Sequence, residues 1–169
     1  MTLTDAPTVP EAVIDTQSVL DWLYFHDPAC AGWEAARQAG QWRGVASAAM
    51  RAELAHVLGR MFLPDSSAER NAQVLADFDA RIIVVDAPEA GSVGAPRCRD
   101  RDDQKFIELA VARRVRWLVS RDKMVLKLRS RLRALAGVGV LGAQGWNIEL
   151  HVGKCSYLAP PPQNLKSTF

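Results

Sequence analysis

Cysteine is scarce in this sequence, which contains only Cys30, Cys98 and Cys155. Their number is odd, their spacing is wide and no pair has the spacing of metal ligands, so we predict free thiols in a reducing cytoplasm. Long apolar runs are also missing, because none reaches the roughly 18 to 20 residues of a membrane span. The first residues lack the positive charge and apolar core of a secretory signal. The sequence therefore predicts a cytoplasmic protein with no membrane partner.

Histidine is equally rare, and His26, His56 and His151 form no cluster. No Ser, Cys and His residues are arranged as a catalytic triad, so we expect no mechanism of that kind. The composition is that of a globular domain, with 49% hydrophobic and 24% charged residues among 169. There is no internal repeat. We expect one domain over residues 1–150, followed by a C-terminal tail over residues 151–169.

The small net charge of +2 hides an asymmetry along the chain. Residues 1–96 hold 6 Lys/Arg and 13 Asp/Glu, a net charge of −7, whereas residues 97–133 hold 13 Lys/Arg and 5 Asp/Glu, a net charge of +8. A basic stretch beside acidic residues is typical of an enzyme that attracts a polyanion while it holds cations. The alternative is that the basic helices only present a solvated face.

Short apolar runs alternate with segments of helical periodicity, which predicts an α/β fold. We expect strands at residues 13–16, 44–47, 82–85, 117–119 and 137–141, and helices at 19–25, 33–39, 48–62, from Ser66, from Asp103 and at 123–135. Ser66-x-x-Glu69 has the pattern of a capping box. The β-branched run 82–85 predicts a strand covered on both faces. Residues 127–133 (KLRSRLR) also alternate like a strand, so a strand is the alternative to a helix in this segment. The order predicts a mostly parallel sheet with helices on both faces.

Acidic residues follow the expected strands or begin the helices between them. They are Asp15 after the first strand, Asp122 after strand 117–119, Asp100, Asp102 and Asp103 before a helix, and Glu53 at the edge of the apolar face of helix 48–62. Parallel sheets bind ligands beyond the carboxyl ends of their strands. Two carboxylates about 4 Å apart repel by roughly 4 kcal/mol at an effective dielectric near 20, and a divalent cation removes that repulsion. Ligands that are all oxygen favour Mg²⁺ or Mn²⁺.

Each acid also has a purely structural interpretation. Asp100, Asp102 or Asp103 could cap a helix, and Asp122 could open a turn or cap the next helix. Glu53 alone is read more simply as a surface residue, and Asp86 as a loop acid. Asp15 is harder to explain in this way, because a charge at the end of a buried strand is costly without a partner.

Four stretches of the sequence resemble the PIN-domain nucleases, and more closely a bacterial toxin-like PIN subgroup. They are Val13–Thr16, Met50–Leu54, Cys98–Phe106 and Leu118–Lys123, and their order and spacing match across roughly residues 12–142. The resemblance implies a three-layer fold with a parallel sheet of four or five strands, and metal-dependent cleavage of RNA. It implies that the acidic quartet around Mg²⁺ or Mn²⁺ is Asp15, Glu53, Asp103 and Asp122, with Asp103 preferred to Asp102 and Asp100. Thr16 and Ser120 match hydroxyl positions that orient ligands or water.

Two residues depart from the family pattern without removing an acid. Gln17 stands where many relatives have Asn, and Arg101 where close relatives often have Pro. Arginines and lysines flank the acids and are expected to bind phosphates, namely Arg99, Arg101, Arg121 and Lys123. The resemblance also implies an antitoxin protein as a partner, and a homodimer.

The sequence thus predicts a metal-dependent endoribonuclease, the toxin of a toxin–antitoxin pair. The alternative from another class is a non-catalytic PIN-fold module that binds nucleic acid or protein through a degenerate site. A third interpretation is a phosphatase-like or receiver-like domain with Asp15 as its nucleophile. That interpretation is weakened because Gln17, not Asp, lies two residues further on.

Overall fold

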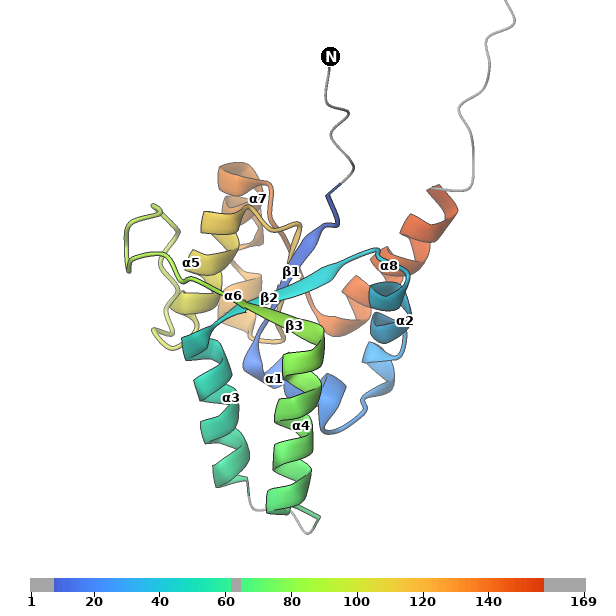
Figure 1. The fold of residues 1–169 in the computed structure, drawn as a ribbon. Coiled ribbons are helices and arrows are strands. Elements are labelled where there is room, and N and C mark those ends of the chain that lie inside the picture. The colour runs from blue at the N-terminus through green and yellow to red at the C-terminus, as the bar shows by residue number, and fades with distance from the viewer. Residues whose placement is uncertain (1–7, 62–64, 157–169) are drawn as a thin grey trace, which may run out of the picture.

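The fold is a five-stranded sheet between layers of helices, described by a computed structural model over residues 8–61 and 65–156 (Figure 1). The strands are β1 (Glu11–Ile14), β2 (Arg43–Ser47), β3 (Ile82–Val85), β4 (Trp117–Val119) and β5 (Gly139–Leu141). The helices are α1 (Thr16–Leu23), α2 (Trp33–Gln38), α3 (Ala48–Arg60), α4 (Ala68–Arg81), α5 (Gln104–Arg113), α6 (Lys123–Leu126), α7 (Arg129–Ala136) and α8 (Ala143–Ser156), with a short 3₁₀ turn at Pro28–Cys30.

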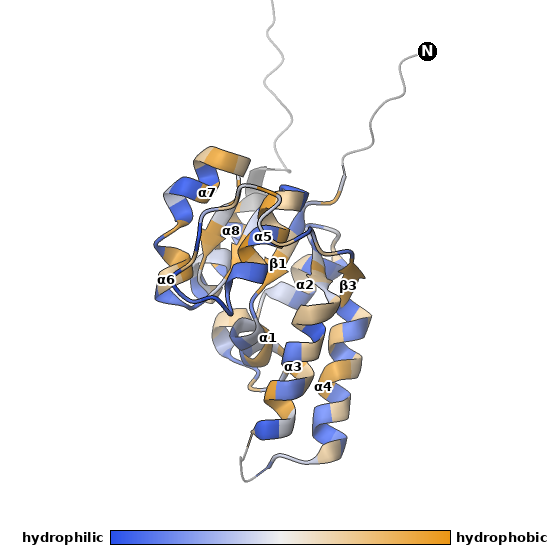
Figure 2. Ribbon diagram, turned by 90° about the vertical axis from the view of Figure 1, so that its left-hand side faces the viewer, coloured by the Kyte–Doolittle hydropathy of each residue, from blue (hydrophilic) through white to orange (hydrophobic). Residues whose placement is uncertain are grey.

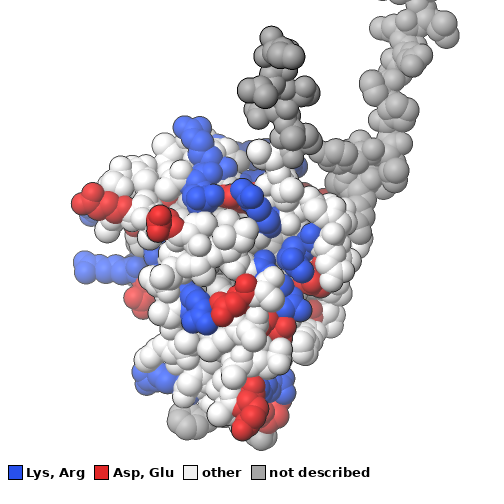
Figure 3. Space-filling model, in the orientation of Figure 1, with Lys and Arg blue, Asp and Glu red and all other residues white. Residues whose placement is uncertain are grey.

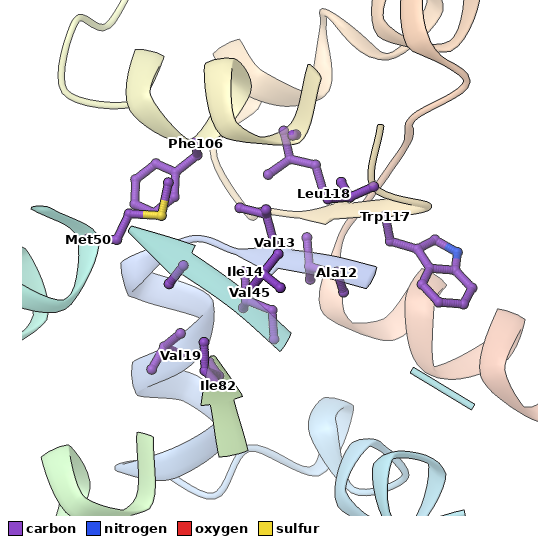
Figure 4. Close-up of a cluster of buried hydrophobic side chains, with 14 of the residues drawn as sticks. Ala12, Val13, Ile14, Val19, Val45, Met50, Ile82, Phe106, Trp117 and Leu118 are labelled. Carbon is purple, nitrogen blue, oxygen red and sulfur yellow. The ribbon is translucent and has the colours of Figure 1, made fainter. Parts of the chain in front are cut away.

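All neighbouring strands are parallel, in the order β3-β2-β1-β4-β5. Figure 1 shows α5 and α7 on one side of the sheet, and α2 and α8 on the other. The predicted α/β class with helices on both faces is therefore confirmed. Strand β1 is central, and its Ala12 and Val13 are fully buried. Figure 4 shows these side chains with Leu118 of β4 and Val45 of β2 in one apolar cluster.

Helices α3 and α4 lie side by side and extend beyond the sheet (Figures 1 and 2). Figure 2 shows hydrophilic and hydrophobic bands alternating along both helices, as amphipathic helices require. Leu54 and Leu58 of α3 are buried, as are Val74 and Phe78 of α4. The cap of α4 is Ser67, whose side chain accepts the N–H of the residue three positions on, so the predicted start at the preceding serine was displaced by one residue.

All five tryptophans lie in one connected aromatic cluster. Trp146 of α8 packs edge-on against Trp33 and Trp42, with ring centroids 4.7 Å apart in both pairs. Trp22 lies 5.8 Å and 5.7 Å from the same two rings, and Trp117 lies 5.9 Å from Trp146. The sequence prediction that most tryptophans pack in the core is consistent with this arrangement. The cluster also explains how α8 is fixed to the sheet.

Three expectations about elements were wrong. The segment 123–135 forms two short helices, α6 and α7, instead of one. Strand β3 is not covered on both faces, because it lies at the edge of the sheet and Ile83 and Val84 are 50% and 45% exposed. Helix α8, which spans Ala143–Ser156, was not predicted. The rest of the expected tail, residues 157–169, lies outside the described residues.

Cys30 and Cys98 are free thiols, as predicted, whereas the Cys155 side chain lies outside the described part. Burial raises the pKa of the Cys30 thiol to about 12. Within residues 8–61 and 65–156, no helix is long and apolar enough to cross a membrane.

Candidate functional site

The site begins where the chain leaves β1 and β4, two neighbouring strands at the centre of the sheet. Strand β1 leads to β2 on one side, while β4 lies on its other side, so the strand order reverses between β1 and β4. Such a switch point leaves a crevice at the carboxyl ends of the strands. The N–H of Asp15 donates to the carbonyl of Val119 at 2.9 Å, which joins the two strand ends.

A pocket of about 560 Å³ opens at this position. Its acidic lining residues are Asp15, Glu53, Asp100, Asp103 and Asp122, and its other lining residues include Thr16, Gln17, Phe106, Arg121 and Lys123. The four acids expected from the sequence thus come from four separate segments and line one cavity. Which of them hold a ligand remains a prediction.

Asp15 is buried and caps a helix. Its backbone is extended, and its Oδ1 accepts the N–H of Ser18 at 2.7 Å at the start of α1. Asp15 as a whole is only 5% exposed. Burial raises the pKa of the Asp15 carboxyl, although hydrogen bonds from Ser120 and Ser18 oppose the rise. The partner that a buried charge requires is therefore supplied partly by the helix and partly by Ser120.

Asp122 also caps a helix, so its structural interpretation holds. Its Oδ1 accepts the N–H groups of Met124 at 2.6 Å and Val125 at 3.3 Å, at the start of α6. The Ser120 hydroxyl in turn accepts the N–H of Asp122 at 3.0 Å. Both capping bonds use the same carboxylate oxygen. The capping role therefore leaves Oδ2 of Asp122 available to the pocket.

Asp103 occupies the N-cap position of α5, yet its side chain makes no capping hydrogen bond. Burial and, after it, the charges of Asp122, Asp100 and Asp15 together raise the pKa of the Asp103 carboxyl to about 6, and Lys105 opposes this rise. The capping interpretation therefore fails for Asp103. Among residues 8–61 and 65–156 its carboxylate forms no ion pair, and the repulsion from the neighbouring acids is the electrostatic condition that a bound cation would relieve.

The other two acids of this loop differ from each other. Asp100 lines the pocket, and its Oδ1 accepts the N–H of Asp102 at 2.9 Å. Asp102 is exposed and does not line the pocket. The loop itself is tied to α5 by Gln104, whose Oε1 accepts the N–H of Cys98 at 2.7 Å and whose Nε2 donates to the carbonyl of Pro96 at 3.3 Å. Sequence reasoning missed Gln104, although it stands directly after the acidic run.

Glu53 does not occupy a simple surface position, because both of its carboxylate oxygens have partners. Oε1 accepts the hydroxyl of Thr16 at 2.5 Å. Oε2 forms an ion pair with the ammonium group of Lys105, at the start of α5. Thr16 and Ser120 thus contact three of the four acids between them, counting the hydrogen bond of Ser120 to Asp15. Lys105 was also missed from the sequence.

The donor chemistry of the pocket fits a divalent cation, because its acids offer only oxygen ligands and the charges of Asp122, Asp100 and Asp15 help to raise the pKa of Asp103. The carboxylates are not gathered into a ready-made coordination shell: within the described ranges, no group of three or more His, Cys, Asp or Glu side chains is placed to hold a metal ion. Asp15 and Asp122 point one oxygen to helix N–H groups, and Glu53 is engaged by Thr16 and Lys105.

Only two of the four predicted phosphate-binding residues line the pocket. Arg121 and Lys123 line the pocket, whereas Arg99 and Arg101 are exposed on the loop outside its lining. One nitrogen of Arg121 is held by both carboxylate oxygens of Asp21, at 3.0 Å and 3.1 Å. The guanidinium group is therefore positioned at the rim while its side chain stays 59% exposed.

Folding also interleaves the two oppositely charged parts of the sequence. Arg113 pairs with Glu11 at 2.7 Å and Arg121 with Asp21 at 3.0 Å, so basic residues from later in the chain neutralise acids of the first part. Figure 3 accordingly shows blue and red side chains mixed over this face, without a large region of one sign. The asymmetry along the chain thus does not become a one-signed surface on this side.

Comparison with known proteins agrees with this geometry. Residues 11–124 match the PIN domain family, and this span contains all four predicted acids. The chain belongs to the PIN domain family. PIN domains are typically nucleases, and PIN nucleases generally use divalent metals. A crystal structure of PAE2754 from Pyrobaculum aerophilum superposes with a TM-score of 0.56 at 14% sequence identity, over 87% of this chain and 99% of that chain. This likeness concerns the fold alone. No protein of curated function matches the sequence.

Proposed function

We propose that this PIN domain is a Mg²⁺- or Mn²⁺-dependent endoribonuclease that hydrolyses RNA phosphodiester bonds. The observation that supports it best is Asp103, an uncapped carboxylate whose pKa is raised to about 6 by burial and by the acids around it. A carboxylate cluster of this kind destabilises a metal-free fold, so its presence in a pocket calls for a functional reason. Binding of a divalent cation by Asp15, Asp103, Asp122 and Glu53 supplies that reason.

The residues around the pocket have three roles in this proposal: binding the cation, orienting its ligands and binding the phosphates of the RNA. Asp103 and Asp122 would hold the cation with their free oxygens, while Thr16 orients Glu53 and Ser120 orients Asp15. When bound, Mg²⁺ or Mn²⁺ would supply Lewis acidity toward the scissile phosphate and would lower the pKa of a water molecule. Arg121, fixed at the rim by Asp21, and Lys123 bind phosphates that flank the cleaved bond.

Cleavage of a labelled single-stranded RNA with Mn²⁺ tests this function, and two neighbouring acids provide a matched pair of variants. Asp103→Asn removes a pocket carboxylate without removing a capping hydrogen bond, whereas Asp102→Asn changes an exposed acid outside the pocket. We expect Asp103→Asn to lower the cleavage rate by roughly a hundredfold or more and Asp102→Asn to leave it within about twofold. Equal rates for the wild type and Asp103→Asn would count against the proposal.

The non-catalytic alternative also has an observation in its favour, since no ready-made metal group is found within the described residues. Under that alternative the PIN fold binds nucleic acid or protein without cleaving it. Calorimetric titration with Mn²⁺ distinguishes the two, because the nuclease requires a saturable site that Asp103→Asn weakens. Absence of heat with the wild-type protein would favour the binding module.

The biological setting is a further proposal. We infer that the protein acts in the cytoplasm as the toxin of a toxin–antitoxin pair, with an antitoxin protein and a second copy of the chain as partners. The support is the toxin-like pattern of the four acidic stretches. Expression in a bacterial host with and without the adjacent reading frame tests it. Growth arrest that Asp103→Asn abolishes and the neighbouring gene relieves is the expected result, and unimpaired growth would contradict the toxin role.

A further inference from the structure

Lys105 is held between the acids by three contacts. Its ammonium group forms an ion pair with Oε2 of Glu53 and donates to the backbone carbonyl of Asp102. It also lies 4.9 Å from the centroid of the Phe106 ring, which is itself buried. The Lys105 and Glu53 side chains are only 27% and 29% exposed. A side chain fixed from three directions is not a solvated surface lysine.

The same ammonium group opposes the acid cluster. Lys105 lowers the pKa of Asp103, whereas Asp122, Asp100 and Asp15 raise it. Of the two cations that line the pocket, Arg121 is already paired with Asp21, and Lys123 has no ion pair within residues 8–61 and 65–156. Lys105 thus acts on two of the acids: it pairs with Glu53 and lowers the pKa of Asp103.

The ion pair of Glu53 with Lys105 and the binding of a divalent cation by Glu53 oppose each other. Oε1 of Glu53 accepts the hydroxyl of Thr16, which is neutral, whereas Oε2 is paired with the positive charge of Lys105, so a cation that binds through Oε2 meets Lys105 there. A divalent cation near Oε2 would also repel the ammonium group directly. The two positive charges therefore compete for one oxygen.

We propose that Lys105 is a built-in counter-ion that neutralises Glu53 in the metal-free protein and is released when a divalent cation binds, so that it sets the metal affinity of the site. This inference rests on the proposed function, because it assumes that the pocket takes Mg²⁺ or Mn²⁺. Lys105 is a positioning residue in this scheme: it acts on the cation through Glu53.

Calorimetric titration of the full chain with Mn²⁺ tests the competition. Lys123→Gln removes a positive charge from the lining of the pocket, and Lys105→Gln removes one that is paired with Glu53 of that lining; of these two lysines, only Lys105 forms an ion pair with an acid of the quartet among the described residues. We expect Lys105→Gln to bind Mn²⁺ roughly tenfold more tightly than the wild type, and Lys123→Gln to change the affinity by less than about threefold. Equal tightening in both variants would show a general charge effect, and weaker binding by Lys105→Gln would show that Lys105 supports the site; either result overturns the inference.

A second measurement on the wild-type protein keeps the inference testable if Lys105→Gln does not fold. Amine labelling followed by mass spectrometry reports how accessible each lysine is. Mn²⁺ is expected to increase labelling of Lys105 and to leave Lys127, which is exposed and outside the pocket, unchanged. Unchanged Lys105 labelling at saturating Mn²⁺ overturns the release. Failure of the wild type to bind Mn²⁺ at all overturns the proposed function as well, so the two failures are distinguishable.

Discussion

Removing the charge of Asp103 should make the metal-free protein more stable, which is the opposite of the usual effect of a substitution in a partly buried site. The pKa of Asp103 rises from an ordinary value of 3.8 to about 6, mainly through burial and the charge of Asp122. Each pKa unit corresponds to about 1.4 kcal/mol, so the full rise equals roughly 3 kcal/mol, and solvent screening of a partly exposed carboxyl reduces it to on the order of 1 kcal/mol. Asp103→Asn loses no capping hydrogen bond that would offset this gain.

The sign of the pH dependence follows from the raised pKa. Well below pH 3.8 the Asp103 carboxyl is protonated in both the folded and unfolded states, so it does not penalise folding. As the pH rises through 3.8 to about 6, the unfolded chain releases its proton more readily than the folded one, and stability is lost. The advantage of Asp103→Asn should therefore be small near pH 4 and complete near pH 7.

Urea unfolding in EDTA, followed by tryptophan fluorescence at both pH values, measures this difference. Asp102→Asn is the control, since Asp102 is exposed and outside the pocket, and it should stay within about 0.5 kcal/mol of the wild type. With Mn²⁺ at roughly a hundred times its dissociation constant the wild type should gain about 2.7 kcal/mol, and Asp103→Asn much less. An Asp103→Asn protein that is less stable than the wild type at pH 7 in EDTA, or a difference that does not change with pH, would refute the electrostatic reasoning.

Three further predictions concern other parts of the molecule. Trp146→Ala should cost about 3 to 5 kcal/mol in urea unfolding, because its fully buried ring joins the aromatic cluster, while Ile148→Ala, on the same helix but 58% exposed, should cost less than about 1 kcal/mol; similar costs would contradict the role of the cluster. Thr16→Val should weaken Mn²⁺ binding severalfold in calorimetry because it removes the hydroxyl that donates to Glu53, and Thr16→Ser should restore it; a serine variant as weak as valine would argue for a packing role. Ile83→Lys should change the free energy of unfolding by less than about 0.5 kcal/mol, since this side chain at the sheet edge is 50% exposed; a loss of several kcal/mol would show that β3 is covered by a partner.

Much of the fold could be predicted because its signals are local. The spacing of Leu54 and Leu58 along one helix face and the short apolar runs of the strands reflect periods of 3.6 and 2 residues, which the chain carries regardless of its neighbours. Helix α8 lacked such a signal. Its inward side chain Trp146 becomes a core residue only beside Trp33 and Trp42, which lie about a hundred residues earlier and which no local pattern connects to it.

The burial of β3 shows another limit. Its residues Ile82–Val85 have the same character as those of a central strand, and only the order of strands decides that this one lies at the edge. That order depends on which strands the helices allow to pair, which is a property of the whole sheet. A prediction from composition alone therefore placed β3 too deep.

The sequence by itself determined that carboxylates lie at strand ends and helix starts. Local patterns give the order of the strands and helices, and Asp15, Asp103 and Asp122 stand at their ends in the sequence. The sequence did not determine which of these carboxylates accept hydrogen bonds from the N–H groups at the start of a helix. Asp15 and Asp122 have extended backbones and use one oxygen as a cap, while Asp103 has a helical backbone and does not. The pairing of Glu53 with Lys105 joins segments far apart in sequence, and only the tertiary structure sets the distance between these two charges.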